Sequence, residues 1–264
     1  MIKENCVNTK GYLHQPALQA VLIAGLAFSA CSAQAAIAPD RTRLVFKGDQ
    51  QSISVDLKNA NDKLPYLAQS WIEDSKNNKI TSPLMVVPPV QRIEASSTGQ
   101  VKVQGMPALG ALPQDKETLF YFNVREIPPK SDKPNTLQIA LQTRIKLFYR
   151  PAAIAKTDPI HPWQNKVTLL RQGDRWQVNN PTAYYVIISK AANRVNGDAP
   201  ASFTSLVIAP QSSQMMTVKA GDLGCAPVLT YVDDYGARLE LVFDCSGNQC
   251  AVNEEKSRKA QSHQ

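Results

Sequence analysis

The sequence has little of the chemistry that most enzymes require. Its 264 residues include three histidines, His14, His161 and His263. It lacks a His-Glu-x-x-His metal motif, a glycine-rich phosphate loop and a Gly-x-Ser-x-Gly nucleophile turn. Asp233 and Asp234 are adjacent, but neighbours on a strand point to opposite faces, so we expect one in solvent and one in a salt bridge. We therefore expect a protein that is not an enzyme and binds no cofactor or metal.

An apolar run long enough to span a bilayer is also missing. The run Ala17–Ala30 falls short of the roughly 20 residues that a spanning helix needs. It follows a polar segment with two lysines and precedes Ala33-Gln34-Ala35, which is typical of a secretory signal and its cleavage site. The segment Phe28–Cys31 is a weaker match to a lipoprotein cleavage box. We predict a signal peptide over 1–35, a new start at Ala36, and no stable membrane insertion.

Clustered positive charge is absent although the formal net charge is +7. The basic residues are spread along the chain, without a block of five and without interleaved aromatic residues. This distribution argues against nucleic-acid binding. An acidic or carboxylate-bearing partner remains compatible with it.

Cysteine is scarce after residue 35, where only Cys225, Cys245 and Cys250 remain. Cys245 and Cys250 lie at the base of a turn between the β-like runs Leu239–Phe243 and Ala251–Val252. In an oxidising compartment this spacing predicts a hairpin disulfide, which would constrain the unfolded chain by about 2 kcal/mol. We predict that Cys225 is a buried, unpaired thiol.

Short runs with β periodicity, separated by turn-forming segments, fill most of the remaining sequence. In the first half they are Ile53–Leu57, Tyr66–Ile72, Val101–Val103, Phe120–Arg125 and Leu137–Leu147. In the second half they are Val167–Leu170, Trp176–Val178, Tyr184–Ile188, Leu206–Ile208, Met215–Val218, Val228–Val232 and Leu239–Phe243. The pattern predicts an all-β protein with two immunoglobulin-like sandwiches. We place them at 36–154 and 155–254, followed by a charged, disordered tail over 255–264.

The segment Leu137–Leu147 alternates apolar and polar residues without proline or glycine, and it is long for a strand. It suits a core strand of an ordinary sandwich. The alternative is an edge strand that is kept long and apolar because it is lent to a partner.

Five segments in order resemble the PapD-like periplasmic pilus chaperones. They are Asp40–Phe46, Leu112–Pro129, Leu137–Pro151, Asn180–Tyr185 and Asp234–Gly236. The resemblance covers the whole chain after residue 35, and the short connection between Phe122 and Leu137 is similar to the short-loop subclass. Ala183 departs from the pattern, since many members have proline there.

The resemblance implies two immunoglobulin-like domains arranged in an L, or boomerang, with a cleft between them. It implies a periplasmic protein that binds pilin subunits by donor-strand complementation and delivers them to an outer-membrane usher. By their match to the family, Leu137, Ile139 and Leu141 would be the residues lent to the subunit. Whether the free protein self-associates through the same edge is left open.

The resemblance also assigns charged residues. Arg43 and Lys146 match the pair that grips the subunit's C-terminal carboxylate. Glu117, Arg150 and Asp234 match an ion network that holds the two domains. Lys146 has the opposite strand parity from Ile139, so a bulge or an approach along the cleft rim would have to reconcile the two roles.

A pilin or adhesin and a periplasmic hydrolase are the two alternatives. A pilin would be one incomplete sandwich with a donor extension at its start, whereas this sequence predicts two sandwiches with Arg43 close to the predicted start. The missing catalytic motifs argue against a hydrolase.

Overall fold

The computed structural model describes residues 35–131 and 134–262, and this part of the chain is almost entirely β. Its helical elements are four 3-10 turns and one α-helix: η1 (Pro107–Ala111), η2 (Ala152–Ile154), η3 (Trp163–Lys166), η4 (Ala220–Leu223) and α2 (Glu254–Gln261). Within the described ranges, no helix has the length and apolar character needed to cross a membrane.

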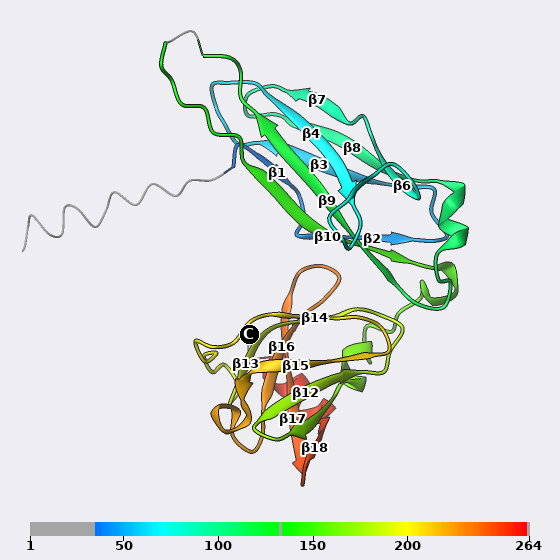
Figure 1. Ribbon diagram of the computed structural model, residues 1–264, viewed down its shortest axis with the longest axis vertical. Coiled ribbons are helices and arrows are strands. Elements are labelled where there is room, and N and C mark those ends of the chain that lie inside the picture. The colour runs from blue at the N-terminus through cyan, green and yellow to red at the C-terminus, as the bar shows by residue number, and fades with distance from the viewer. Residues whose placement is uncertain (1–34, 132–133, 263–264) are drawn as a thin grey trace, which may run out of the picture. The chain divides into compact units, whose positions relative to one another are not determined.

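The first sandwich consists of two sheets (Figure 1). One contains, in pairing order, β1 (Ile37–Pro39), β3 (Ser52–Asn59), β8 (Thr98–Gly105) and β6 (Leu84–Val87). The other contains β2 (Arg43–Lys47), β10 (Gln142–Arg150), β9 (Thr118–Ile127), β4 (Tyr66–Glu73) and β5 (Lys79–Ile80), with β7 (Val90–Ile93) paired to β4. These strands pair antiparallel, except that β2 and β10 run parallel.

Alternate residues of these strands form the core between the two sheets. Phe122 of β9 and Leu147 of β10 are fully buried, and they face Val55 and Val101 from the opposite sheet. Because side chains alternate along a strand, the residues between them are left for the outer faces. The even-numbered residues of β10 therefore lie on the side away from this core.

The second sandwich is one continuous sheet of eight strands, whose two halves share a core (Figure 1). In pairing order they are β14 (Leu206–Ile208), β13 (Val186–Ala192), β16 (Val228–Val232), β17 (Arg238–Ser246), β18 (Gln249–Val252), β11 (Thr168–Gln172), β12 (Arg175–Asn180) and β15 (Ser212–Lys219). Val178 from one half and Leu241 from the other belong to the same buried cluster. The two predicted β-sandwiches are thus confirmed.

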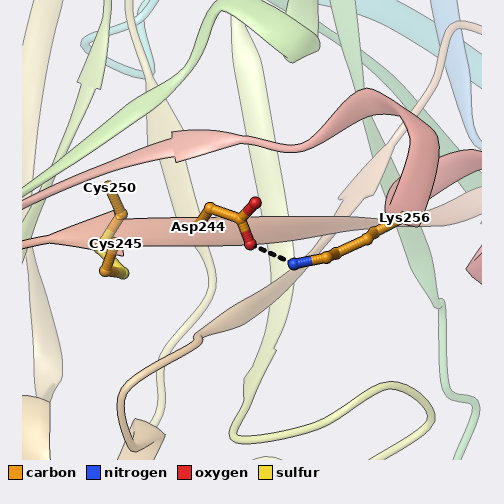
Figure 2. Close-up of a disulfide and its surroundings, with 4 residues drawn as sticks. All are labelled: Asp244, Cys245, Cys250 and Lys256. Carbon is orange, nitrogen blue, oxygen red and sulfur yellow. Dashed lines mark hydrogen bonds and ion pairs between the residues drawn. A yellow bond between two sulfur atoms is a disulfide. The ribbon is translucent and has the colours of Figure 1, made fainter.

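The predicted hairpin disulfide is present. Cys245 of β17 and Cys250 of β18 are directly opposite each other in the pairing register, and their sulfur atoms are bonded. Figure 2 shows the bridge next to Asp244, whose carboxylate pairs with Lys256 of α2. The disulfide therefore closes the same hairpin against which the last helix is held.

The prediction that residues 255–264 are disordered is wrong for the part that the structure describes. Residues Glu254–Gln261 form α2, and the Asn253 side chain caps the helix by accepting from the Lys256 N–H at 2.9 Å. Ser257 and Ala260 are buried against the sheet. These residues are too small to give the apolar period that sequence reasoning seeks, and the helix is held by capping and backbone contacts instead.

Two further expectations are corrected. The strand predicted over Leu137–Leu147 begins only at Gln142, and residues 137–141 have no regular secondary structure. Cys225 is unpaired as predicted, but it is exposed rather than buried. It follows η4 and the turn at Gly224, outside any strand, so no sheet face covers it.

Candidate functional site

Arg43 and Lys146 are cross-strand neighbours. Arg43 begins β2, Lys146 lies in β10, and the two residues are partners in the parallel pairing of these strands. Ile145 and Leu147 face the first core, so Lys146 lies on the opposite face. The pairing of β10 with β9 is regular from Gln142 to Tyr149, which excludes a bulge in that stretch.

Burial of this pair is only partly compensated. Arg43 donates through Nη1 to the carbonyl of Val232 at 3.5 Å, whereas its Nε is buried without a hydrogen-bond partner. Lys146 is half-buried and has no hydrogen bond or ion pair within the described residues. Two cationic side chains therefore lie next to each other, and each has N–H groups without a hydrogen-bond partner among the described residues.

The surroundings of Arg43 and Lys146 lower the pKa of both side chains. Burial lowers the pKa of Lys146, and the positive charges of Arg43 and Arg144 lower it further. Burial also lowers the pKa of Arg43, while the negative charges of Asp233 and Asp234 oppose that shift. A bound anion would relieve the repulsion and satisfy the free donors, so this pair is a candidate carboxylate-binding site.

A surface groove of about 460 Å³ lies beside Arg43. It is lined by Asp40, Arg41, Arg43, Val45, Lys47, Arg150, Thr157, Asp234 and Tyr235. Lys146 is not among these residues. The groove therefore reaches Arg43 of the pair and not Lys146.

Arg150, Glu117 and Asp234 meet in one charged cluster. Arg150 is 1% exposed; its Nε donates to Glu117 at 2.7 Å, and its Nη1 and Nη2 donate to the two oxygens of Asp234 at 2.8 and 2.9 Å. The second oxygen of Glu117 accepts from the backbone N–H of Tyr185 at 2.7 Å. Residues of both sandwiches thus converge on one guanidinium group.

The charges in this cluster shift each other's pKa. Burial raises the pKa of Glu117, opposed by Arg150 and by the hydrogen bond from Tyr185. The pKa of Arg150 is raised, because hydrogen bonds and charge from its two carboxylates outweigh the effect of burial. Arg150 therefore stays charged and remains paired with its two carboxylates.

A tight turn between β16 and β17 presents Asp234 to Arg150. Asp233 and Asp234 lie in this turn and not on a strand, which corrects the premise of opposite strand faces. Asp233 closes the turn by accepting from the N–H groups of Tyr235 and Ala237, whereas Asp234 forms the salt bridge. Gly236 has φ of 93°, and a Cβ there would lie 2.6 Å from Thr42 Oγ1, so the turn requires glycine.

The three residues matched to the donor role lie just before β10. Leu137 is 86% exposed and Ile139 is 64% exposed, while Leu141 is half-buried. Exposed aliphatic side chains at alternate positions are unusual outside interfaces. Sequence reasoning assigned no role to Arg144 of β10, which donates to Glu73 and Asn77 and lies over the Tyr121 ring.

Within residues 35–131 and 134–262, no three His, Cys, Asp or Glu side chains are grouped as a metal ion would require.

Comparison with known proteins gives a consistent result over most of the chain. The family model "Pili and flagellar-assembly chaperone, PapD N-terminal domain" matches residues 36–155, and "Pili assembly chaperone PapD, C-terminal domain" matches residues 162–243. The probable fimbrial chaperone YfcS of Escherichia coli (strain K12) is 61% identical over 234 residues, covering 89% of this chain and 92% of YfcS.

Two further proteins extend the similarity. The chaperone protein PapD of Escherichia coli is 46% identical over 230 residues, covering 87% of this chain and 95% of PapD. The solved complex of Salmonella enterica SafA pilin with the SafB chaperone contains a chain that superimposes with a TM-score of 0.67. That match has 20% identity and covers 80% of this chain and 97% of the other, which supports the fold.

Proposed function

The chain belongs to the PapD family of pilus-assembly chaperones, and from that premise we propose how its own residues handle a pilin subunit. In this proposal, residues 137–141 become an added strand of the subunit. Arg43 and Lys146 then bind the subunit's C-terminal carboxylate. The complex is passed to an outer-membrane usher, and the protein works in the periplasm after removal of residues 1–35.

The free edge of β10 is the observation that carries the proposal. From Gln142 to Ile145, β10 pairs only with β9 within the described residues, and β2 covers its other edge only from Lys146 onward. Leu137 and Ile139 continue the chain backwards from this free edge with their side chains exposed. An edge with apolar side chains at alternate positions is suited to β-strand addition.

The cation pair lies where an added strand would have to stop. A subunit strand that runs parallel along residues 137–145 would meet the first residue of β2, Arg43, because β2 occupies the same edge beyond that point. A chain ending there would place its terminal carboxylate against Arg43 and Lys146. Charge-assisted hydrogen bonds contribute about 1.5–3 kcal/mol each, enough to set the register of the added strand.

In one regular strand, Lys146 and Ile139 would face opposite sides. The absence of regular structure over residues 137–141 in the free protein removes this conflict. The regular alternation of β10 begins at Gln142, so the free protein fixes no parity for Leu137 and Ile139. Pairing of residues 137–141 with the incoming subunit would then decide to which face Leu137 and Ile139 point. This ordering costs about 1–2 kcal/mol per residue and would be offset by new hydrogen bonds and buried apolar surface.

The proposal is tested by refolding a denatured pilin subunit with the chaperone and measuring the soluble complex. Replacing Leu137 and Ile139 together with Ser should abolish most of the complex while circular dichroism and melting temperature stay unchanged, because both side chains are exposed in the free protein. The matched control is Gln138→Ser with Ala140→Ser, on the alternate positions, which should retain binding. Equal losses in the two double variants would contradict donor-strand addition.

A further inference from the structure

Glu126 is a buried carboxylate that has no cationic partner in the part of the chain that the structure describes. The inward residues of β9 are Phe120, Phe122 and Val124, and Glu126 takes the next inward position with 5% exposure. Within the described residues, no Lys, Arg or His nitrogen lies within 4.0 Å of its oxygens. Among the described residues, the Glu126 carboxylate accepts one hydrogen bond, from the backbone N–H of Ile37 at 2.9 Å.

Charged side chains on the neighbouring strands do not compensate Glu126. Arg125 points to the other face of β9, where it contacts Gln142 and the Trp71 ring. On β4 the partner of Glu126 in the register is an alanine, and on β7 the exposed Arg92 pairs with Glu94. Lys58 of β3, beside β1, is also exposed. A buried charge with one hydrogen bond is costly, so a further donor is expected.

The predicted signal cleavage would create such a donor beside Glu126. Cleavage after Ala35 makes Ala36 the first residue, one position before Ile37. The Cα atoms of consecutive residues lie about 3.8 Å apart. Ala36 is held in place, since its carbonyl accepts the Ala60 N–H at 2.7 Å and Ile37 begins β1. Its nitrogen is therefore anchored next to the residue that already contacts Glu126.

Cleavage changes the charge at this nitrogen. Hydrolysis of the Ala35–Ala36 peptide bond consumes one water, leaves a carboxylate on Ala35, and leaves an amine on Ala36 that takes up a proton. A neutral amide with one N–H becomes an ammonium group with three. An α-amino group has an ordinary pKa of about 7.7–8.0, so it is mostly protonated at neutral pH.

We propose that Glu126 is the binding site for the α-ammonium group of Ala36. The first sandwich then acquires its buried ion pair only after the signal peptide is removed, and processing completes the fold at this end. The inference rests on cleavage after Ala35. It is separate from pilin binding, which uses residues 137–146.

A double-mutant cycle on the unfolding equilibrium tests the ion pair. Four proteins are compared in urea: a chain starting at Ala36, the same chain with a Gly-Ser extension, and the Glu126→Gln variant of each. Glutamine keeps an oxygen for the Ile37 N–H, so the substitution removes charge while preserving that bond. The extension and the substitution should each raise the unfolding constant about tenfold, and together they should do little more than either alone.

The matched control is Glu94→Gln, an exposed carboxylate near the same end of the sandwich. Its small effect should add to that of the extension. Additive losses for Glu126→Gln and the extension, or an extension without effect, would overturn the proposal.

Reactivity of the amine gives a second readout that a merely structural role for Glu126 would not change. The α-amine of the chain starting at Ala36 should react severalfold more slowly with a limiting acylating reagent at pH 7 than that of Glu126→Gln. Equal rates would refute the contact. N-terminal sequencing of periplasmic protein comes first, and a start other than Ala36 would overturn the proposal even if pilin capture is normal.

Discussion

At the residue scale, the main feature of the candidate site is that two positively charged side chains, Arg43 and Lys146, are neighbours. Arg43 and Lys146 are adjacent across two strands and half-buried, and no carboxylate of residues 35–131 or 134–262 forms a salt bridge with either. A folded protein gains nothing from this arrangement by itself, because burial and repulsion both disfavour the charged forms. In the proposed function an anionic ligand would stabilise the pair, so its role in binding can be tested separately from any role in stability.

Replacing Lys146 with Met should leave the melting temperature unchanged or slightly higher, since the substitution removes repulsion from Arg43. Affinity for a pilin subunit should fall by about 10-fold to 100-fold, the loss of one charge-assisted contact. Calorimetric melting and titration with a refolded subunit measure the two effects.

The control for this prediction is a subunit whose C-terminal carboxylate is converted to an amide. Wild-type chaperone should bind it about as weakly as Lys146→Met binds the intact subunit, and the two losses should not add. Fully additive losses would mean that Lys146 contacts another part of the subunit.

At the element scale, α2 shows how a helix without an apolar stripe can still be part of the fold. Ser257 Oγ donates to the carbonyl of Asn253 at 2.7 Å and accepts the backbone N–H of Val242 in β17 at 2.9 Å. Gln261 donates to the carbonyl of Glu240 at 2.9 Å. The helix is thus attached to β17 through backbone groups that would otherwise be unsatisfied.

Ser257→Ala should destabilise the protein by about 1–3 kcal/mol, because it leaves the buried N–H of Val242 without an acceptor. Lys259→Ala is the matched control on the same helix: it removes only an exposed pair with Glu255 and should cost about 0.5 kcal/mol or less. Urea unfolding followed by circular dichroism distinguishes the two. Similar small effects in both variants would show that the helix contributes little to folding.

At the scale of the whole molecule, the contact between the sandwiches combines charge with apolar packing. Arg150 joins Glu117 to Asp234, and Glu117 also accepts the Tyr185 N–H of the second sandwich. Leu119 and Phe148 of the first sandwich pack with Ile187 of the second. Removing Glu117 or Asp234 leaves the buried Arg150 with one carboxylate instead of two, so these residues should couple the folding of the two sandwiches.

Glu117→Ala should cost about 3–5 kcal/mol, because it leaves the buried Arg150 with one carboxylate and the Tyr185 N–H with none. Asp234→Ala should cost less, since the Asp234 side chain is 24% exposed and water can replace part of the contact. Differential scanning calorimetry should also show two separated transitions in Glu117→Ala. A single transition at the wild-type temperature would contradict a coupling role.

Much of the β content follows from local pattern. Strands such as Leu206–Ile208 and Val228–Val232 have the predicted bounds, and the disulfide is the predicted one, because side-chain alternation and short turns are local properties. The tail and Cys225 were mispredicted for the converse reason. A helix held by caps and backbone contacts, and a cysteine outside every strand, leave no periodic signal.

By itself the sequence determined two β-sandwiches, a hairpin disulfide and a family resemblance, all of which depend on residue type and spacing along the chain. Only the tertiary structure decided that β10 begins at Gln142, that Lys146 lies opposite Arg43, and that Glu126 contacts Ile37. These contacts join residues about 100 positions apart. Which strands become neighbours is set by the packing of the whole sandwich, since a strand's own period is the same whether its edge is covered or free.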